Sequence, residues 1–109
     1  MSNMDMETVC FEIITCVGSA KSAFVEAIGL AKQGDCAAAR AKITEGDGYF
    51  TEGHHAHADL IAQEADGNSV ALSLLLIHAE DQLMSAETAR IYAMEFIELY
   101  EKLHAHGRS

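Results

Sequence analysis

The stretch Ser69–His104, SVALSLLLIHAEDQLMSAETARIYAMEFIELYEKLH, decides the fold of this chain. It contains neither glycine nor proline, the two residues that most disfavour the interior of a helix. Its apolar residues recur every three or four positions and form one stripe, which only Arg90 interrupts: Leu72, Leu76, Ala79, Leu83, Ala86, Ala93 and Ile97. This spacing predicts a single amphipathic helix over the stretch, about 50 Å long.

A second apolar stripe adjoins the first on the same predicted helix. It contains Leu74, Ile77, Met84 and Ile91. A helix with two apolar faces needs more neighbours than the two other helices of a small bundle can supply. We therefore expect another copy of the chain to cover the second stripe, so the sequence predicts self-association.

Two turn signals divide the rest of the chain into two further helical segments. In Gly34-Asp35 the glycine can end one helix and the aspartate can cap the next, and Asp66-Gly67-Asn68-Ser69 has the same order. The predicted helices cover about residues 4–33, 36–65 and 69–104, and the short connections make neighbours antiparallel. The sequence therefore predicts an all-α, antiparallel three-helix bundle that forms one domain over residues 1–109.

Glycines inside the first two predicted helices weaken them, each by about 1 kcal/mol relative to alanine. In the first helix, we expect Gly18 and Gly29 to allow the close approach of a neighbouring helix. In the second helix, Gly46, Gly48 and Gly53 lie near one another and predict a kink or a frayed stretch.

The composition excludes several classes of function. Lys and Arg total 7 against 17 Asp and Glu, and the net charge of −10 disfavours binding to nucleic acid or to anionic membrane surfaces. Cys10, Cys16 and Cys36 have no Cys-x-x-Cys spacing, so we expect small buried residues in a reducing compartment. No signal-peptide pattern opens the chain, and no apolar run approaches the roughly 20 residues of a membrane span. We therefore expect a cytoplasmic protein without direct membrane insertion.

Two polar residues interrupt the most apolar part of the third predicted helix. Asp81 lies in the second stripe between Ile77 and Met84, where a carboxylate is costly unless it is paired, protonated or bound to a metal. If symmetry copies of Asp81 converge, their charges need a cation, and oxygen ligands suit Mg²⁺. His78 is three residues from Asp81 and four from Gln82, a spacing that suits proton transfer, metal ligation or nucleophilic phosphoryl transfer. A core histidine and a surface ion pair would explain the same spacing.

A second group of histidines precedes the second turn. His54 and His57 are three residues apart and could share a metal ion, with His55 or Asp59 nearby. No further ligand follows at a convincing zinc spacing, so structural or surface histidines are the simpler interpretation. His104 and His106 are typical of a frayed tail beyond the third helix.

Several segments together resemble one known family over nearly the whole chain. His78–Met84, HAEDQLM, resembles the HAQDHLM signature of the lactose/cellobiose-type enzyme IIA of the bacterial sugar phosphotransferase system. The other segments that are similar to the family are Phe11–Ile14, Gly34–Ala39, Glu52–His54 and the closing run Phe96–Leu103.

The resemblance implies a homotrimer of three-helix subunits in which His78 is the phosphoacceptor. It implies that His78 takes a phosphoryl group from the phosphohistidine of HPr and passes it to a cysteine of enzyme IIB. The process would serve uptake of a β-disaccharide of the lactose, cellobiose or chitobiose type. Asp81 corresponds to the metal-associated aspartate on the trimer axis of the family, which implies a divalent cation such as Mg²⁺.

Two residues next to the acceptor depart from the family pattern. Glu80 replaces a usual glutamine and Gln82 replaces a usual histidine, although both positions remain supporting residues for His78. Glutamine can donate an N–H to a phosphoryl oxygen, whereas an ionised glutamate cannot and would repel the phosphoryl group. We expect these two changes to affect the rate of phosphoryl transfer and the choice of partner protein. They also support the alternative prediction, a non-catalytic helical regulatory or interaction protein that retains the fold.

Overall fold

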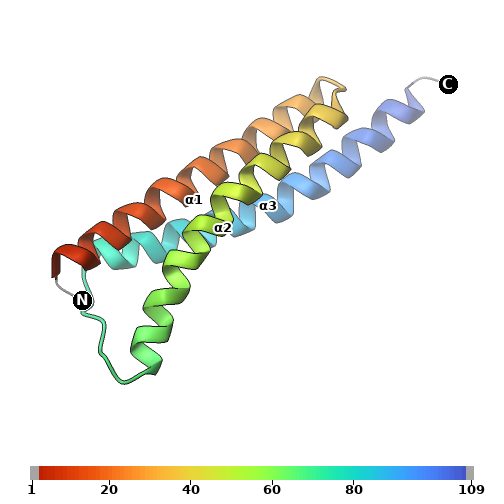
Figure 1. The fold of residues 1–109 in the computed structure, drawn as a ribbon. Coiled ribbons are helices and arrows are strands. Elements are labelled where there is room, and N and C mark those ends of the chain that lie inside the picture. The colour runs from red at the N-terminus through yellow and green to blue at the C-terminus, as the bar shows by residue number, and fades with distance from the viewer. Residues whose placement is uncertain (1–2, 108–109) are drawn as a thin grey trace.

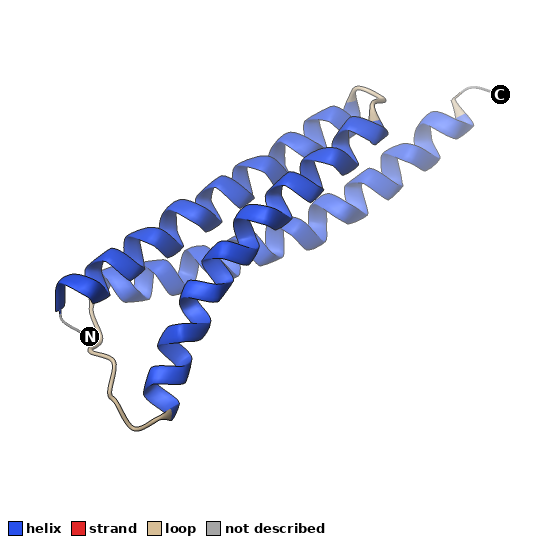
Figure 2. Cartoon of the chain, viewed as in Figure 1, coloured by secondary structure: helices blue, strands red, loops and turns tan. Residues whose placement is uncertain are grey.

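The computed structural model describes residues 3–107 and consists of three long helices (Figure 1). They are α1 (Asn3–Lys32), α2 (Cys36–Ala65) and α3 (Leu74–His106), and the described residues contain no strand (Figure 2). α2 runs antiparallel to α1, and α3 runs back beside α1 in the same direction as α1 (Figure 1). The bundle is a rod of 61 × 20 × 20 Å, and the all-α, three-helix prediction is confirmed. Residues 1–2 and 108–109 of the predicted domain lie outside the described part of the chain.

The first turn has the form that the sequence predicts. Gly34 adopts a φ of +90°, a left-handed conformation that suits glycine, and ends α1. The carboxylate of Asp35 then accepts a hydrogen bond from the backbone N–H of Ala38 at 3.0 Å and caps α2. α2 begins and ends at the predicted residues.

The third helix begins later than predicted, at Leu74 rather than at Ser69. The cap is Ser73, whose hydroxyl oxygen accepts a hydrogen bond from the backbone N–H of Leu76 at 3.1 Å. This serine directly precedes the apolar run of the helix, so it satisfies a donor of the first turn that Ser69 is too far away to reach.

The connection between α2 and α3 is longer than a tight turn. Gly67, with a φ of +89°, ends the turn after α2, and residues 68–73 then run without helical structure. Val70 packs against the core from within this connection, so its burial does not require a helix. Leu72, predicted on the buried stripe, is instead 82% exposed.

α1 is the central helix, because it packs along its length against both α2 and α3. Its buried residues recur every three or four positions and fill two apolar clusters that follow each other along the rod: Cys10, Ile13, Val17, Ala20, Phe24, Ala27 and Ala31. α1 is also the described helix that is long and apolar enough to cross a membrane by length and composition. In this fold, one stripe of α1 is buried in the protein core, while other apolar residues such as Phe11 and Val25 are exposed.

Two glycines of α2 allow it to approach α1 closely. A Cβ added at Gly46 would lie 2.5 Å from Cε1 of Phe24, and one added at Gly53 would lie 2.7 Å from Cγ1 of Val17. Both distances are far below van der Waals contact, so a side chain at either position would push the helices apart. α2 is one continuous helix, so the predicted frayed stretch is wrong, whereas its path bends midway along its length (Figure 1).

The glycines of α1 do not have the role that the sequence suggested for them. A Cβ added at Gly18 or Gly29 would meet no atom within 4 Å. Both positions border open space rather than a neighbouring helix, so the prediction of close helix approach there is wrong for the single chain. Close approach depends on the glycines of α2 instead.

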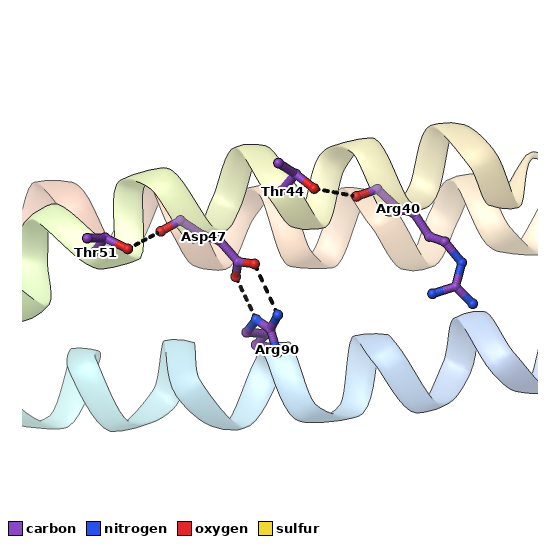
Figure 3. A network of polar contacts seen from close by, with 5 residues as sticks. All are labelled: Arg40, Thr44, Asp47, Thr51 and Arg90. Atoms are coloured by element: carbon purple, nitrogen blue, oxygen red, sulfur yellow. Dashed lines mark hydrogen bonds and ion pairs between the residues drawn. The ribbon is translucent and has the colours of Figure 1, made fainter.

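α2 and α3 contact each other much less than either contacts α1, and Figure 1 shows the C-terminal half of α2 diverging from α3. Arg90, which interrupts the apolar stripe, donates through Nε and Nη2 to the Asp47 carboxylate at 2.6 and 3.0 Å (Figure 3). Polar contacts of this kind recur along the whole seam: Arg40–Glu101, Asp47–Arg90 and His57–Glu80.

The end of α3 is attached to the bundle and is not a frayed tail. The helix continues to His106, and Nε2 of His104 donates a hydrogen bond to the backbone oxygen of Ala31 at 3.1 Å. The His104 ring also stacks on Tyr100, with ring centroids 6.2 Å apart. His104 thus adds a second hydrogen bond to a carbonyl in the last turn of α1, which also accepts from the backbone N–H of Gly34 at 3.0 Å.

Candidate functional site

His78 lies one turn into α3 on the outside of the bundle. Leu76 and Ala79, on either side of it in sequence, are buried against the core and fix the rotation of the helix about its axis. This rotation leaves the His78 side chain exposed, and its ring has no hydrogen-bond or ion-pair partner within residues 3–107. A nitrogen with a free lone pair on an exposed ring is accessible to a second protein, as a group-transfer nucleophile requires.

Asp81, three residues after His78, is also exposed and lies on the adjoining outward face of α3. This face also presents Ile77, Met84 and Ile91, whose exposed fractions are 56, 58 and 55%. The predicted second stripe therefore exists and is uncovered in the single chain. A shallow depression beside Asp81 is lined by both polar and apolar side chains, among them Ser85 and Tyr92.

Gln82 was predicted to support His78, and the structure leaves them unconnected. Gln82 is half-buried beside the core, and no hydrogen bond joins His78 to Gln82 or Asp81 in the part of the chain that the structure describes. The ring orientation of His78 is therefore not set by its neighbours within one copy of the chain.

Glu80, the other predicted supporting residue, faces α2. Its Oε1 lies 2.6 Å from Nε2 of His57, so the two side chains share a hydrogen bond across the seam. Residues two positions apart on a helix point about 160° away from each other. Glu80 is thus directed away from His78, toward the opposite side of α3.

The histidines of α2 point to different surroundings within the single chain. His57 is engaged with Glu80, while His54 is exposed and lies beside the ring of Phe50 at a centroid distance of 6.1 Å. His55 and Asp59 are exposed. Among the described residues, no group of three or more His, Cys, Asp or Glu side chains is placed to hold a metal ion. The metal interpretation of this segment is therefore unsupported.

The cysteines do not offer a competing nucleophile. Cys10 is buried, and burial together with the charge of Glu80 raises the pKa of its thiol, so the thiol stays protonated at neutral pH. Cys16 is partly exposed and donates to Oε2 of Glu52 at 3.7 Å, and burial and this carboxylate raise its pKa as well. Cys36 is also partly exposed, so the prediction of buried cysteines holds only for Cys10.

The comparison with protein families identifies the chain. Residues 8–101 match the family described as "PTS system, Lactose/Cellobiose specific IIA subunit". The chain belongs to this family. It is an enzyme IIA component of the sugar phosphotransferase system (PTS), and the resemblance of the HAEDQLM segment is confirmed at the level of the family.

Curated relatives in this enzyme IIA family carry different sugar names. The chain is 42% identical over 101 residues to the lichenan-specific phosphotransferase enzyme IIA component of Bacillus subtilis, covering 93% of this chain and 92% of the relative. It is 39% identical over 101 residues to the N,N'-diacetylchitobiose-specific EIIA component of Escherichia coli, and the match covers 93% of this chain and 87% of the relative. It is 34% identical over 102 residues to the lactose-specific EIIA component of Staphylococcus aureus, and the match covers 94% of this chain and 99% of the relative.

Solved structures of enzyme IIA proteins share the fold. The cellobiose-specific enzyme IIA of Bacillus anthracis superimposes with a TM-score of 0.89 at 40% identity, covering 96% of this chain and 94% of that one. The IIA(Chitobiose) chain of an E. coli IIA–HPr complex superimposes with a TM-score of 0.78 at 38% identity, covering 90% of this chain and 95% of that one. Three long helices in this arrangement are therefore the fold of the enzyme IIA family.

Sequence reasoning did not identify His57 as the partner of Glu80. The two residues are separated by 23 positions, and their contact depends on how far α2 and α3 diverge at that level of the bundle. A helical pattern places His57 on α2 but does not say which α3 residue it meets.

Proposed function

We propose that His78 is the phosphoacceptor of this enzyme IIA, that it receives its phosphoryl group from the phosphohistidine of HPr, and that it passes the group to a cysteine of enzyme IIB. The main support is the exposed, unpartnered ring of His78 within the family segment HAEDQLM. A solved complex between a related IIA and HPr supports HPr as the donor.

The chemistry needs little from the protein beyond access and position. A ring nitrogen of neutral His78 attacks the phosphorus of phospho-HPr in line with the leaving histidine nitrogen. One N–P bond forms as the other breaks, and the HPr histidine regains its lone pair. In the second step, a cysteine thiolate of enzyme IIB attacks the same phosphorus, and His78 leaves as neutral imidazole.

The proposed active form is a homotrimer in which the outward faces of three α3 helices meet. Ile77, Met84 and Ile91 are more than half exposed in one chain, and a continuous apolar face of this kind favours an interface. Three copies around an axis would bury this face in a common helical core.

A divalent cation, with Mg²⁺ as the first choice, would then lie among three copies of Asp81. One chain supplies a single carboxylate at this position, which does not satisfy a cation that binds six oxygen atoms. Three convergent carboxylates and bound water fit that donor set. The cation would offset their mutual repulsion, and no step of phosphoryl transfer depends on it.

The proposed setting is the cytoplasm, where HPr and enzyme IIB would meet the trimer. The proposed sugar class is a β-disaccharide, since relatives are named for lactose, cellobiose and N,N'-diacetylchitobiose. The negative charge of the chain, −10, makes direct contact with anionic lipid or nucleic acid unfavourable.

Intact mass spectrometry tests the acceptor. After incubation with phosphoenolpyruvate, enzyme I and HPr, we expect one acid-labile phosphoryl group per chain in the wild type and none in His78→Ala. His55→Ala, which removes another exposed histidine, is the matched control and is expected to take up phosphate normally. Uptake by His78→Ala at the wild-type level would assign the acceptor elsewhere, and no uptake by any variant would favour the non-catalytic alternative.

A further inference from the structure

Glu80 places a carboxylate two positions from His78, and phosphoryl transfer brings more negative charge to the same place. The phosphoryl group of a phosphohistidine is dianionic or nearly so at neutral pH. Charges within a Debye length of each other, about 10 Å at 0.1 M salt, repel appreciably. The rise between residues two apart on a helix is only about 3 Å, so a mobile Glu80 side chain can lie within that range.

The structure holds the Glu80 side chain away from the acceptor. Its carboxylate is directed to α2, where Oε1 lies 2.6 Å from Nε2 of His57. His57 itself has little freedom, because its side chain is 16% exposed and it lies between buried Ala56 and Leu60 of α2. A fixed donor and a short contact restrain the carboxylate, although 41% of the Glu80 side chain remains exposed.

The other groups near Glu80 do not hold it in the same way. Cys10 of α1 is close enough for the Glu80 charge to influence its thiol, but that buried thiol is neutral. Glu64 of α2 lines the same groove and carries a like charge, which would repel Glu80. Within the described residues, His57 is the side chain that hydrogen-bonds Glu80.

We propose that His57 is a positioning residue for phosphoryl transfer, holding the Glu80 carboxylate against α2 so that the side of α3 bearing His78 remains free of its charge. His57 does not touch the phosphoryl group. It acts through Glu80, whose hydrogen bond to Nε2 of His57 keeps the carboxylate on the α2 side of α3. This inference rests on the proposed role of His78.

A double-mutant cycle with phospho-HPr as the donor tests the proposal. We expect His57→Ala to slow the first-order uptake of phosphate by about threefold to tenfold at low salt, because the freed carboxylate repels the donor. The combined variant His57→Ala/Glu80→Gln should return to within about twofold of the wild-type rate, because the charge is gone. The defect of His57→Ala should also shrink as the salt concentration rises, which a purely structural defect would not do.

Asp47→Asn is the matched control, because it weakens a bridge of the same seam two to three turns further along α3. We expect it to change thermal stability slightly and to leave the uptake rate unchanged. A wild-type rate in His57→Ala, or a double variant as slow as His57→Ala alone, would overturn the positioning role. Absence of uptake by the wild-type chain would instead overturn the proposed function, and the positioning role with it.

Discussion

The inward and outward faces of α3 are both apolar, yet only the inward face is covered by the chain itself. The inward face alternates large residues with alanines, and Ala79, Ala86 and Ala93 are 1% exposed or less. The outward face carries larger side chains, such as Ile77 and Met84, at more than half exposure. Alanines seven residues apart let α1 come close, whereas large side chains keep any partner at a greater distance. Residue size therefore separates the two faces where apolar periodicity does not.

Enlarging an alanine on the inward face should have the largest effect. Ala86 is fully buried, so Ala86→Leu adds volume where α1 and α3 are in contact, and we expect a loss of about 1–3 kcal/mol of unfolding free energy. Chemical denaturation monitored by circular dichroism measures this free energy of unfolding. Ala41→Leu, on an exposed position of α2, should stay within about 0.5 kcal/mol of wild type. Equal effects of the two substitutions would remove the distinction between the faces.

A charge on the outward face should disrupt assembly and spare the fold. We expect Ile91→Lys to shift the mass measured by light scattering from trimer to monomer, because three lysines would be buried at one interface. Helix content should stay at the wild-type level, since Ile91 is 55% exposed in the single chain. Ala41→Lys adds the same charge away from α3 and should leave the trimer intact. A trimeric Ile91→Lys protein would place the interface on another surface.

A smaller change on the same face tests the role of Asp81. In the presence of a chelator, we expect Asp81→Leu to dissociate at a lower protein concentration than wild type. Removing converging like charges in favour of apolar groups is often stabilising, by about 1–4 kcal/mol. Added Mg²⁺ should then strengthen the wild-type trimer and leave Asp81→Leu unaffected. Sedimentation equilibrium with and without Mg²⁺ measures the trimer dissociation of both proteins. If Mg²⁺ does not change the dissociation of the wild-type trimer, the shared cation is excluded.

Much of the fold follows from the sequence because its signals are local. The capping side chain of Asp35 and the left-handed Gly34 act within a few residues, so the bounds of α2 are predictable from the chain alone. The predicted start of α3, Ser69, was wrong because two serines of this stretch, Ser69 and Ser73, can each cap a helix. The choice of Ser73 depends on Val70 packing against the core, which is a tertiary contact.

Other features depend on distances between helices and could not be predicted. Gly46 and Gly53 look like helix breakers in sequence, and only the position of α1 shows that a side chain would collide with it. The end of α3 looked frayed until His104 was seen to bond Ala31, 73 positions earlier in the chain. Of the site, the exposure of His78 follows from the two stripes. The partner of Glu80 does not, because it lies on another helix.

The central position of α1 has a consequence for how the protein is made. Its first partner, α2, follows after a short turn, whereas its second partner, α3, is synthesised only after α2 and a further connection. The α1–α2 hairpin therefore emerges from the ribosome with the α3-facing side of α1 still in water, including apolar residues of both clusters. Contacts between α1 and α3 span a long stretch of sequence, so they form last and set the pace of folding. Until then, the nascent chain exposes apolar surface and is open to chaperones or to misassembly with other chains.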